Sequence, residues 1–425
     1  MDIRKYLQDR PLAFVVWTAA AAFFTYFSMY AFRKPLSAGT FEGLELWGIS
    51  YKVILVVAQV LGYLFSKLIG IKVISELQPN RRFLMLIGLV GFSEIALILF
   101  ALTPFPYGFI WVFFNGLPLG LIWGIVFSYL EGRRYTDILV TFLSVSFIVS
   151  SGIVKTAGRY LIENAGVNEF WMPALMGLLF FPLLWASAAM LDKAPLPSTT
   201  DQQLRTARVP LYKKDRKYLY KQFAFGLTAI LLVNFVLTIG RDFKDNFLVE
   251  IWQNIGLDHS PFIYAKLEMM VGLLVLVLLA FLVLVKDNSK AFGILHWNML
   301  GGLLLLLIST LLFETRMINA VWWMVLHGIG MYTAYISFQS LYFERFIATF
   351  QIRGTVGYLI YLSDFFGYLG SCLILILKEL LAIQMDWTTF FIQLNYAIAG
   401  IGISCTLAAQ IYFFVRKKHL IKDHA

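Results

Sequence analysis

Long apolar runs recur along the chain, each ended by a short polar stretch. A bilayer core of roughly 30 Å needs about 20 helical residues, and twelve runs meet that length. The first six cover residues 11–33, 50–70, 83–103, 108–130, 137–162 and 170–191, and the second six cover residues 221–242, 261–285, 291–313, 319–343, 355–379 and 388–415. Because lipid offers the backbone no hydrogen-bond partner, runs of this length are expected to be α-helices. The pattern predicts an all-α integral membrane protein with twelve transmembrane helices.

The longest polar stretch divides these predicted helices six and six. Residues 192–220 contain Pro195, Pro197 and the basic run Lys213–Lys217. We interpret this stretch as a cytoplasmic linker, partly helical along the membrane surface. It would join an N-terminal six-helix bundle of residues 1–191 to a C-terminal six-helix bundle of residues 221–425. Equal helix numbers predict that the two bundles are pseudo-symmetric.

Composition and charge place the chain in a membrane and orient it there. Of its 425 residues, 60% are hydrophobic and 14% are charged, which excludes an ordinary soluble domain. A net charge of +10 would suggest nucleic acid for a soluble protein, but here the Lys and Arg residues gather in short loops such as Arg133–Arg134 and near the C-terminus at Arg416–Lys418. Cytoplasmic loops of membrane proteins carry such an excess. We therefore expect both termini in the cytoplasm and no nucleic-acid partner.

The same features set expectations for location and cofactors. The compact loops favour a multi-pass protein of the bacterial cytoplasmic (inner) membrane, and we expect a monomer in the lipid bilayer. Cys372 and Cys405 both lie in apolar runs, and the five histidines have no metal-ligand spacing. No disulfide framework, metal site or other cofactor is therefore expected.

Two arginines occupy matching places in the two predicted halves. Arg33 ends the first run and Arg241 ends the seventh, at nearly the same distance from the start of each run. Arginine keeps its charge and offers a planar fork of donors that suits phosphate or carboxylate. We hypothesise that the two arginines face one cavity and hold a small anionic substrate. The alternative is that both side chains snorkel to the outer interface. We interpret Lys34 and Lys244 as snorkelling or loop residues.

Short motifs in four separate predicted helices resemble those of the organophosphate:phosphate antiporters of the major facilitator superfamily. They are Tyr30-Ala-Phe-Arg33-Lys34, Gly62-Tyr-Leu-Phe-Ser66-Lys67, the second arginine at Arg241, and Phe366-Gly-Tyr-Leu-Gly370. The resemblance implies two bundles related by an axis along the membrane normal, with the substrate between them near the midplane. The chain departs from those carriers in its fifth helix, which has no histidine. The substrate is therefore not restricted to a sugar or glycerol phosphate.

Charged residues inside the predicted fifth and eighth helices suggest an outer gate. Lys155 and Arg159 are four residues apart and share a helix face, so they repel one another unless an anion or acid lies between them. The resemblance makes the fifth and eighth helices neighbours, and Glu268 lies on the eighth. We expect a Lys155–Glu268 or an Arg159–Glu268 pair that opens and closes with transport. Two alternatives are that Lys155 itself binds substrate and that the pair is only structural.

Other polar residues are candidates for an inner gate and for the cavity wall. Glu76 with Arg81 and Arg82 resembles the charge latch between the second and third helices of the superfamily, and we expect a second latch between Lys67 and Asp364. His327 is either a substrate ligand or a packed core histidine. Tyr30 and Tyr332 are expected to line the cavity; the full set of these candidates is Glu76, Arg81, Arg82, Lys67, Asp364, His327, Tyr30 and Tyr332.

These observations favour an alternating-access secondary transporter of an organic anion. A phosphorylated metabolite exchanged for phosphate or coupled to protons fits best. The alternatives are a transporter-like sensor of an external anion and a proton-coupled exporter of drug-like or peptide compounds. An enzyme is not expected, because the sequence shows no nucleophile elbow, no Asp-x-Asp motif and no metal cluster.

Overall fold

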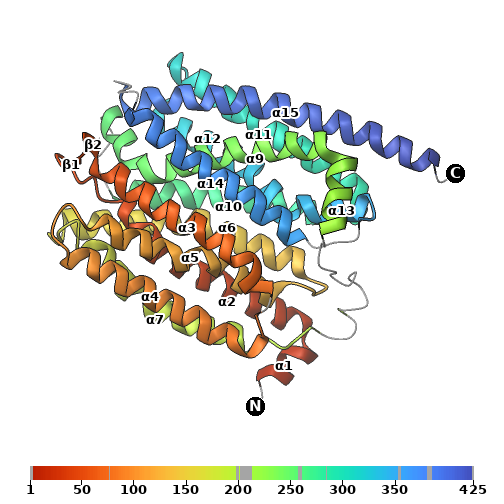
Figure 1. Ribbon diagram of the computed structural model, residues 1–425, viewed down its shortest axis with the longest axis horizontal. Coiled ribbons are helices and arrows are strands. Elements are labelled where there is room, and N and C mark those ends of the chain that lie inside the picture. The colour runs from red at the N-terminus through yellow and green to blue at the C-terminus, as the bar shows by residue number, and fades with distance from the viewer. Residues whose placement is uncertain are drawn as a thin grey trace. The chain divides into compact units, whose positions relative to one another are not determined.

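The computed structural model describes residues 3–75, 77–197, 201, 213–256, 261–283, 285–352, 356–380 and 385–423, and these are almost entirely helical (Figure 1). A short α1 (Ile3–Asp9) precedes the long helices. Those are α2 (Pro11–Arg33), α3 (Tyr51–Ser75), α4 (Arg82–Leu102), α5 (Phe109–Leu130), α6 (Thr136–Glu163), α7 (Met172–Asp192), α9 (Lys213–Ile255), α10 (Phe262–Val283), α11 (Asn288–Glu314), α12 (Ala320–Ile336), α14 (Val356–Leu380) and α15 (Trp387–Asp423). Within the described residues, eleven helices are long and apolar enough to cross a membrane. The predicted all-α membrane fold is confirmed.

The predicted tenth span has a break in its α-helical geometry. Helix α12 has 17 residues and is followed by a π-helical segment, η3 (Ser337–Tyr342), and then by α13 (Phe343–Thr349). A π-helical turn contains an extra residue and often marks a functional position in a helix. The span is therefore helical as predicted, although its regular part is shorter than the other spans.

Helix α9 corrects the sequence interpretation at its C-terminal end. The sequence predicted spans over residues 221–242 and 261–285, which leaves residues 243–260 as a connecting loop, but α9 continues through Ile255 and has 43 residues. Phe243, Phe247 and Ile251 recur every four residues and are buried, which gives this stretch an apolar helical face. The charged residues between them fit the interior because they meet partners of opposite charge there.

The connection between α2 and α3 contains the one β-hairpin among the described residues. Strands β1 (Glu45–Leu46) and β2 (Ile49–Ser50) are antiparallel, with Leu46 opposite Ile49. Trp47 and Gly48 form the turn and both have positive φ, 57° and 73°, as a two-residue hairpin of matching twist requires. Two 3₁₀ turns, η1 (Pro35–Ser37) and η2 (Pro79–Arg81), lie in the connections before α3 and α4.

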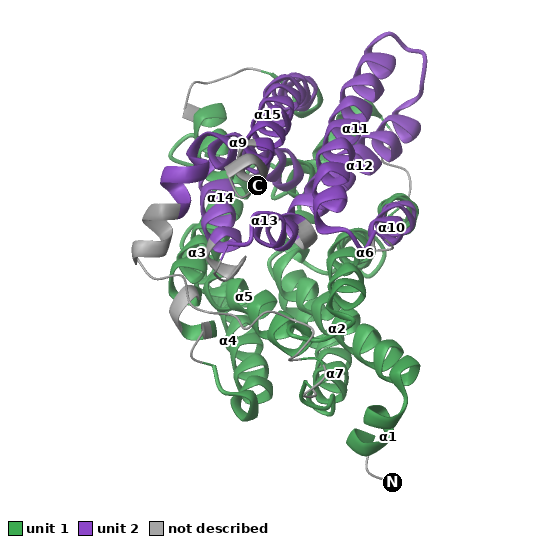
Figure 2. Cartoon of the chain, turned by 90° about the vertical axis from the view of Figure 1, so that its right-hand side faces the viewer, with its two compact units in different colours: residues 1–206, 243–273, 371–388 green, residues 207–242, 274–370, 389–425 purple. Residues whose placement is uncertain are grey.

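The chain forms two compact units (Figure 2). Unit 1 contains residues 1–206, 243–273 and 371–388, and unit 2 contains residues 207–242, 274–370 and 389–425. Unit 1 thus combines the predicted N-terminal bundle with the C-terminal end of α9, the start of α10 and the end of α14. The predicted boundary at residues 192–220 stays a prediction.

Glycines set the closest helix contact in unit 1, between α3 and α5. A methyl group at Gly62 would lie 2.1 Å from the Phe113 carbonyl oxygen, and one at Gly116 would lie 2.2 Å from the Gln59 carbonyl oxygen. The two backbones therefore touch through hydrogens alone, the close approach expected of small residues between membrane helices. In unit 2, Gly302 of α11 and Gly330 of α12 are in similar reciprocal contact.

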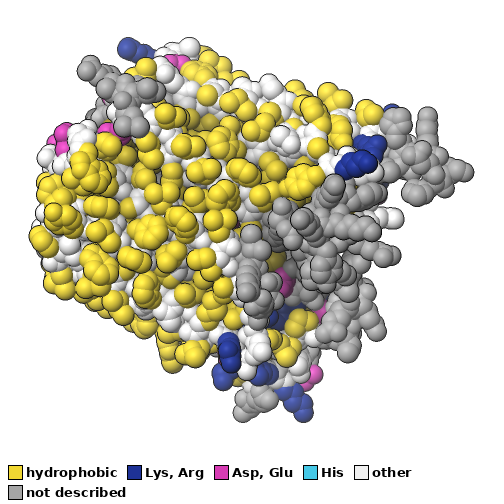
Figure 3. Space-filling model, in the orientation of Figure 1, with side chains coloured by type: hydrophobic (Ala, Val, Ile, Leu, Met, Phe, Trp, Pro, Cys, Tyr) yellow, Lys and Arg dark blue, Asp and Glu magenta, His cyan; other side chains and the backbone are white. Residues whose placement is uncertain are grey.

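Large apolar side chains cover much of the face that Figure 3 shows. Leu12, Leu84 and Met317 are each more than 70% exposed, and many other Leu, Ile and Phe residues are exposed with them. A soluble monomer rarely exposes such an extensive apolar surface. The surface therefore fits contact with lipid.

We expect Gly116→Ala to lower the stability of the protein markedly. Because the new methyl group would collide with backbone atoms of α3, the helices must separate, and overpacking of this kind costs about 1–3 kcal/mol in general. Thermal unfolding in detergent micelles would measure the effect as a lower midpoint.

Gly88→Ala is the matched control for this prediction. Gly88 lies on α4 with no atom within 4 Å of the added methyl group. A midpoint for Gly116→Ala equal to that of Gly88→Ala would contradict the proposed contact.

Candidate functional site

Buried charge concentrates in unit 1, where the end of α2, α6 and the C-terminal part of α9 meet. The Lys34 Nζ lies 3.6 Å from one carboxylate oxygen of Asp245, and the Lys155 Nζ lies 3.7 Å from the other. Ser151 also donates to Asp245, at 3.3 Å, and Lys34 donates to the side-chain oxygen of Asn246 at 3.1 Å. All five side chains are at least 95% buried. One carboxylate therefore serves two lysines in an interior from which water is largely excluded.

Glu268 forms an ion pair, as predicted, but its partner is Lys244 and not Lys155 or Arg159. Glu268 of α10 accepts from Lys244 of α9 at 3.0 Å, whereas Lys155 pairs with Asp245. The expected Lys155–Glu268 and Arg159–Glu268 pairs are therefore wrong. Snorkelling of Lys34 and Lys244 is wrong as well, because both are buried. Lys34 does lie outside a helix, just after the end of α2, whereas Lys244 lies within α9 and not in a loop. The reason is the extra length of α9, which brings Lys244 and Asp245 into a region that the sequence left to a loop.

Helices α6 and α10 are neighbours, as the resemblance implied. A methyl group at Gly152 of α6 would lie 2.6 Å from the Tyr264 carbonyl oxygen and 2.7 Å from the Cβ of Glu268. Thr156 strengthens this contact, because its hydroxyl donates to the Pro261 carbonyl at 2.7 Å and accepts from the Ala265 amide at 3.0 Å. Close backbone packing thus fixes the position of Glu268 beside α6.

A fourth ion pair lies closer to the connecting loops. Lys52, at the start of α3, forms a short ion pair with Glu250 of α9 and also donates to the Ser37 carbonyl at 3.3 Å. Glu250 follows Asp245 by five residues, about 7.5 Å along a helix axis. A cavity of about 270 Å³ opens over this pair, lined by Thr40, Phe41, Glu42, Gly43, Leu44, Glu45, Ser50, Lys52, Glu250, Gln253, Asn254 and Trp387. Lys52 and Glu250 thus line the cavity, whereas Lys34 and Lys155 are not among its lining residues.

Arg33 is buried in unit 1 against a tyrosine. Its guanidinium carbon lies 4.0 Å from the centre of the Tyr63 ring, and the Lys67 Nζ lies 5.2 Å from the same ring. Both side chains are at least 96% buried, which contradicts snorkelling of Arg33. Two predicted cations therefore meet on one aromatic ring, an arrangement stabilised by cation–π attraction.

A polar network fixes the end of α2 that carries Arg33. The Asn115 side-chain amide of α5 donates to the Phe32 carbonyl at 3.0 Å and to the Ser93 hydroxyl at 2.6 Å. Its oxygen accepts from Gln59 at 2.7 Å. Helices α2, α3, α4 and α5 thus share one buried amide. Tyr30 lies beside this end of α2, buried and 6.0 Å from the Arg33 guanidinium carbon.

Arg241 is buried in unit 2 among two tyrosines and a carboxylate. It donates to the Tyr335 hydroxyl through a short contact, to the Tyr368 hydroxyl at 3.1 Å and to Asp242 at 2.9 Å. Gly367 allows this arrangement, because a methyl group there would lie 2.7 Å from the Thr238 hydroxyl of α9. The Phe366–Gly370 motif thus brings α14 against α9 and its tyrosine to Arg241.

The remaining candidates fall in several places. Asp364 accepts from Gln339 at 2.6 Å, and Gln339 also donates to Tyr335 at 3.0 Å. Arg159 pairs with Glu163 one turn later on α6. The Lys67–Asp364 latch and the common cavity of Arg33 and Arg241 join residues of different units and stay predictions.

His327 and Tyr332 are fully buried in α12 of unit 2. The His327 Nε2 lies 3.0 Å from the side-chain oxygen of Asn395, and its ring meets Phe391 edge-on at 5.0 Å. Asn395 and Phe391 both belong to α15. His327 is thus packed in the core, which is one of the two roles that the sequence allowed for it.

The predicted cytoplasmic latch is only partly described. Glu76 lies outside the described residues. Arg81 is exposed, and the Arg82 guanidinium carbon lies 5.2 Å from the centre of the Tyr129 ring. The latch therefore stays a prediction.

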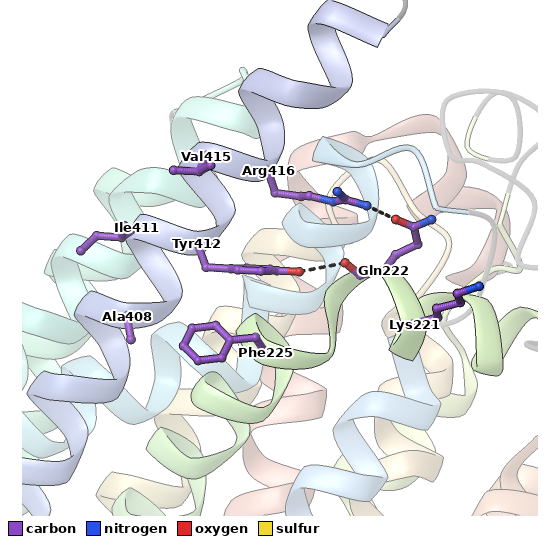
Figure 4. Close-up of a pocket in the computed structure, with 8 residues that line it drawn as sticks. All are labelled: Lys221, Gln222, Phe225, Ala408, Ile411, Tyr412, Val415 and Arg416. Carbon is purple, nitrogen blue, oxygen red and sulfur yellow. Dashed lines mark hydrogen bonds between the residues drawn. The ribbon is translucent and has the colours of Figure 1, made fainter.

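A larger groove lies between α9 and α15 within unit 2 (Figure 4). Its volume is about 690 Å³, and it is lined by Lys221, Gln222, Phe225, Ala408, Ile411, Tyr412, Val415 and Arg416. Tyr412 donates to the Gln222 carbonyl at 2.8 Å, and Arg416 donates to the Gln222 side chain. Phe225 and Ile411 are at least 60% exposed, so this groove fits contact with lipid better than an enclosed substrate site.

Sequence reasoning missed Asp245, Glu250 and Lys52. The signal that would have found the first two is the spacing of Phe243, Phe247 and Ile251, which continues the period of the preceding helix. The charges between these residues favoured a loop instead. Lys52 gave no such signal, because a lysine at a predicted helix start is usually exposed.

We expect Lys244→Met and Glu268→Gln each to destabilise the protein. The double variant should lose less stability than the sum of the two single losses. Removing one partner leaves the other charge buried alone, which costs about 3–5 kcal/mol in general, whereas removing both leaves none. A double-mutant cycle on thermal unfolding should give a coupling of about 0.5–3 kcal/mol.

Lys266→Met combined with Glu268→Gln is the control cycle. Lys266 is exposed on the same helix, so its effect should add to that of Glu268→Gln. Additive behaviour of Lys244→Met as well would exclude a significant Lys244–Glu268 interaction.

The chain matches one protein family over most of its length. Residues 35–417 match a family described as a family of unknown function, DUF5690. No curated protein matches the chain.

Solved structures of similar fold include three transporters. They are a D-xylose-proton symporter (TM-score 0.58, 13% identity, 93% of this chain and 96% of that chain), a mutant of the nucleoside transporter NupG (0.60, 14%, 94% and 100%) and an auto-inhibited POT family peptide transporter (0.58, 14%, 94% and 96%). At these identities the likeness establishes the fold. The chain therefore belongs to the DUF5690 family and has a fold of the major facilitator type.

Proposed function

We propose that this protein is an alternating-access transporter of an organic anion. A phosphorylated metabolite, exchanged for phosphate or moved with protons, is the cargo that we favour. We place the protein in the bacterial cytoplasmic membrane with both termini in the cytoplasm. The structures of similar fold are named as symporters and transporters, which supports a transport role rather than an enzymatic one.

The observation that carries the proposal is the buried positive charge. Lys34, Lys155 and Arg33 lie in unit 1 on segments that belong to the predicted N-terminal bundle, and none is more than 4% exposed. Ionisable groups inside membrane helices are costly and usually serve a ligand or a partner. Basic groups of this number favour an anionic cargo.

The ion pairs of unit 1 support a gate. Lys34, Lys52 and Lys155 come from the predicted N-terminal bundle, and their carboxylate partners come from α9 of the predicted C-terminal bundle. Lys34 and Lys52 lie at the helix ends that the charge pattern assigns to the outer side, and Lys155 and Asp245 lie in the outer halves of α6 and α9. We propose that these pairs close the outer side and separate when the transporter opens outward.

Exchange follows from the same charges. Cations that surround a binding site repel one another, so closing the site without an anion is unfavourable. A bound anion relieves this repulsion and permits the conformational change. Return with phosphate or another anion is therefore easier than return without one.

We expect Arg33→Lys and Arg241→Lys to reduce anion uptake by about tenfold or more each. Lysine keeps the charge but loses the planar fork, and a lost forked contact of about 1.4 kcal/mol corresponds to a factor of ten. Uptake of radiolabelled phosphate and sugar phosphates into liposomes preloaded with phosphate would measure the effect.

Arg10→Lys is the matched control, because Arg10 is exposed before α2 and donates to Tyr6. Its uptake should equal that of the natural protein. Unimpaired uptake by both arginine variants would remove them from the site. Binding without flux would favour a sensor, and flux of cationic drugs or peptides alone would favour an exporter.

A further inference from the structure

The ammonium group of Lys155 is buried with incomplete hydrogen bonding among the described residues. Its Nζ has no exposed surface and makes no hydrogen bond among the described residues. The nearest carboxylate oxygen, on Asp245, is 3.7 Å away, beyond hydrogen-bond distance. An ammonium group carries three donors, and a buried donor without an acceptor is strongly unfavourable. The geometry therefore calls for a further acceptor at Lys155.

Two lysines approach one carboxylate in this region. The Lys34 Nζ lies 3.6 Å and the Lys155 Nζ 3.7 Å from Asp245, whereas Lys52 pairs with Glu250 and Lys244 pairs with Glu268. Asp245 is thus a carboxylate placed between two ammonium groups.

Several donors converge on the same carboxylate. Lys34 approaches it from the end of α2, and Lys155 and Ser151 approach it from successive turns of α6. Two ammonium groups and a hydroxyl are hydrogen-bond donors that suit a tetrahedral oxyanion. Asp245 thus occupies the position that a substrate oxyanion would take.

We propose that Lys155, with Lys34 and Ser151, is a subsite for the phosphate group of a small anion, and that Asp245 is an internal anion that competes for it. When phosphate binds the two lysines, Asp245 loses its partners and the C-terminal part of α9 is released from α6. Anion binding thereby loosens the contact that we assign to the outer gate. The inference rests on the proposed function for the identity of the cargo.

Equilibrium binding of inorganic phosphate to the full-length purified protein tests the subsite. Lys155→Met should weaken phosphate binding by tenfold or more, because it removes one cation and keeps the side-chain volume. Asp245→Asn should strengthen binding several-fold, because it removes the competing charge. An opposite change for Asp245→Asn, or natural affinity in Lys155→Met, would overturn the proposal.

Asp137→Asn is the control for Asp245→Asn. It removes a carboxylate from the first turn of α6, the helix that carries Lys155, but leaves both lysines unchanged, so phosphate affinity should stay within twofold of the natural protein. If Lys155→Met fails to fold, Ser151→Ala provides the test with a smaller change, and its phosphate affinity should fall several-fold. Unchanged affinity in that variant would count against the subsite.

Two further measurements distinguish this subsite from a lipid site and separate phosphate binding from transport. Micelles containing phosphatidic acid should not displace bound phosphate; displacement would mean a site for lipid headgroups and would overturn the proposal. Phosphate flux tests the transporter independently. Binding that depends on Lys155 in a protein without flux would refute transport and keep the subsite, whereas normal flux with unchanged binding in Lys155→Met would refute only the subsite.

Discussion

Positive charge buried inside a helical membrane protein is the constraint on which this structure depends. An ammonium group removed from water needs a carboxylate or another acceptor close by. Lys34, Lys52 and Lys155 lie beside carboxylates only because α9 continues as a helix beyond residue 242 and brings Asp245 and Glu250 to them. The burial of these lysines therefore depends on the length of α9.

The ion pairs combine stability with reversibility in a way that suits a gate. A buried ion pair is costly to break when nothing replaces the lost partner. A lysine can, however, exchange its carboxylate partner for another anion. An apolar contact has no such replacement. A gate that is held by carboxylates and opened by an anionic cargo therefore responds to that cargo, whereas a purely apolar gate does not.

The sequence by itself determined the class of the protein. Runs of about 20 apolar residues have one stable form in lipid, so the helices and their approximate limits followed from hydropathy. It also identified Arg33, Arg241, Lys67 and Lys155 as unusual, since a charge inside an apolar run is visible in one dimension. The glycines of the Gly62 and Phe366–Gly370 motifs indicated close packing, and the structure contains it at Gly62, Gly367 and Gly370.

Tertiary structure decided which charges meet. Lys155 pairs with Asp245 and Glu268 pairs with Lys244 because of the length and rotation of α9. Hydropathy did not predict this part of the helix, because charged and aromatic residues alternate in it and lower its mean hydropathy. The sequence assigned that stretch to a loop since an isolated charged segment prefers water. Only the packed helices supply the opposite charges that reverse this preference, and partners that lie far apart in the chain leave no local signal in it.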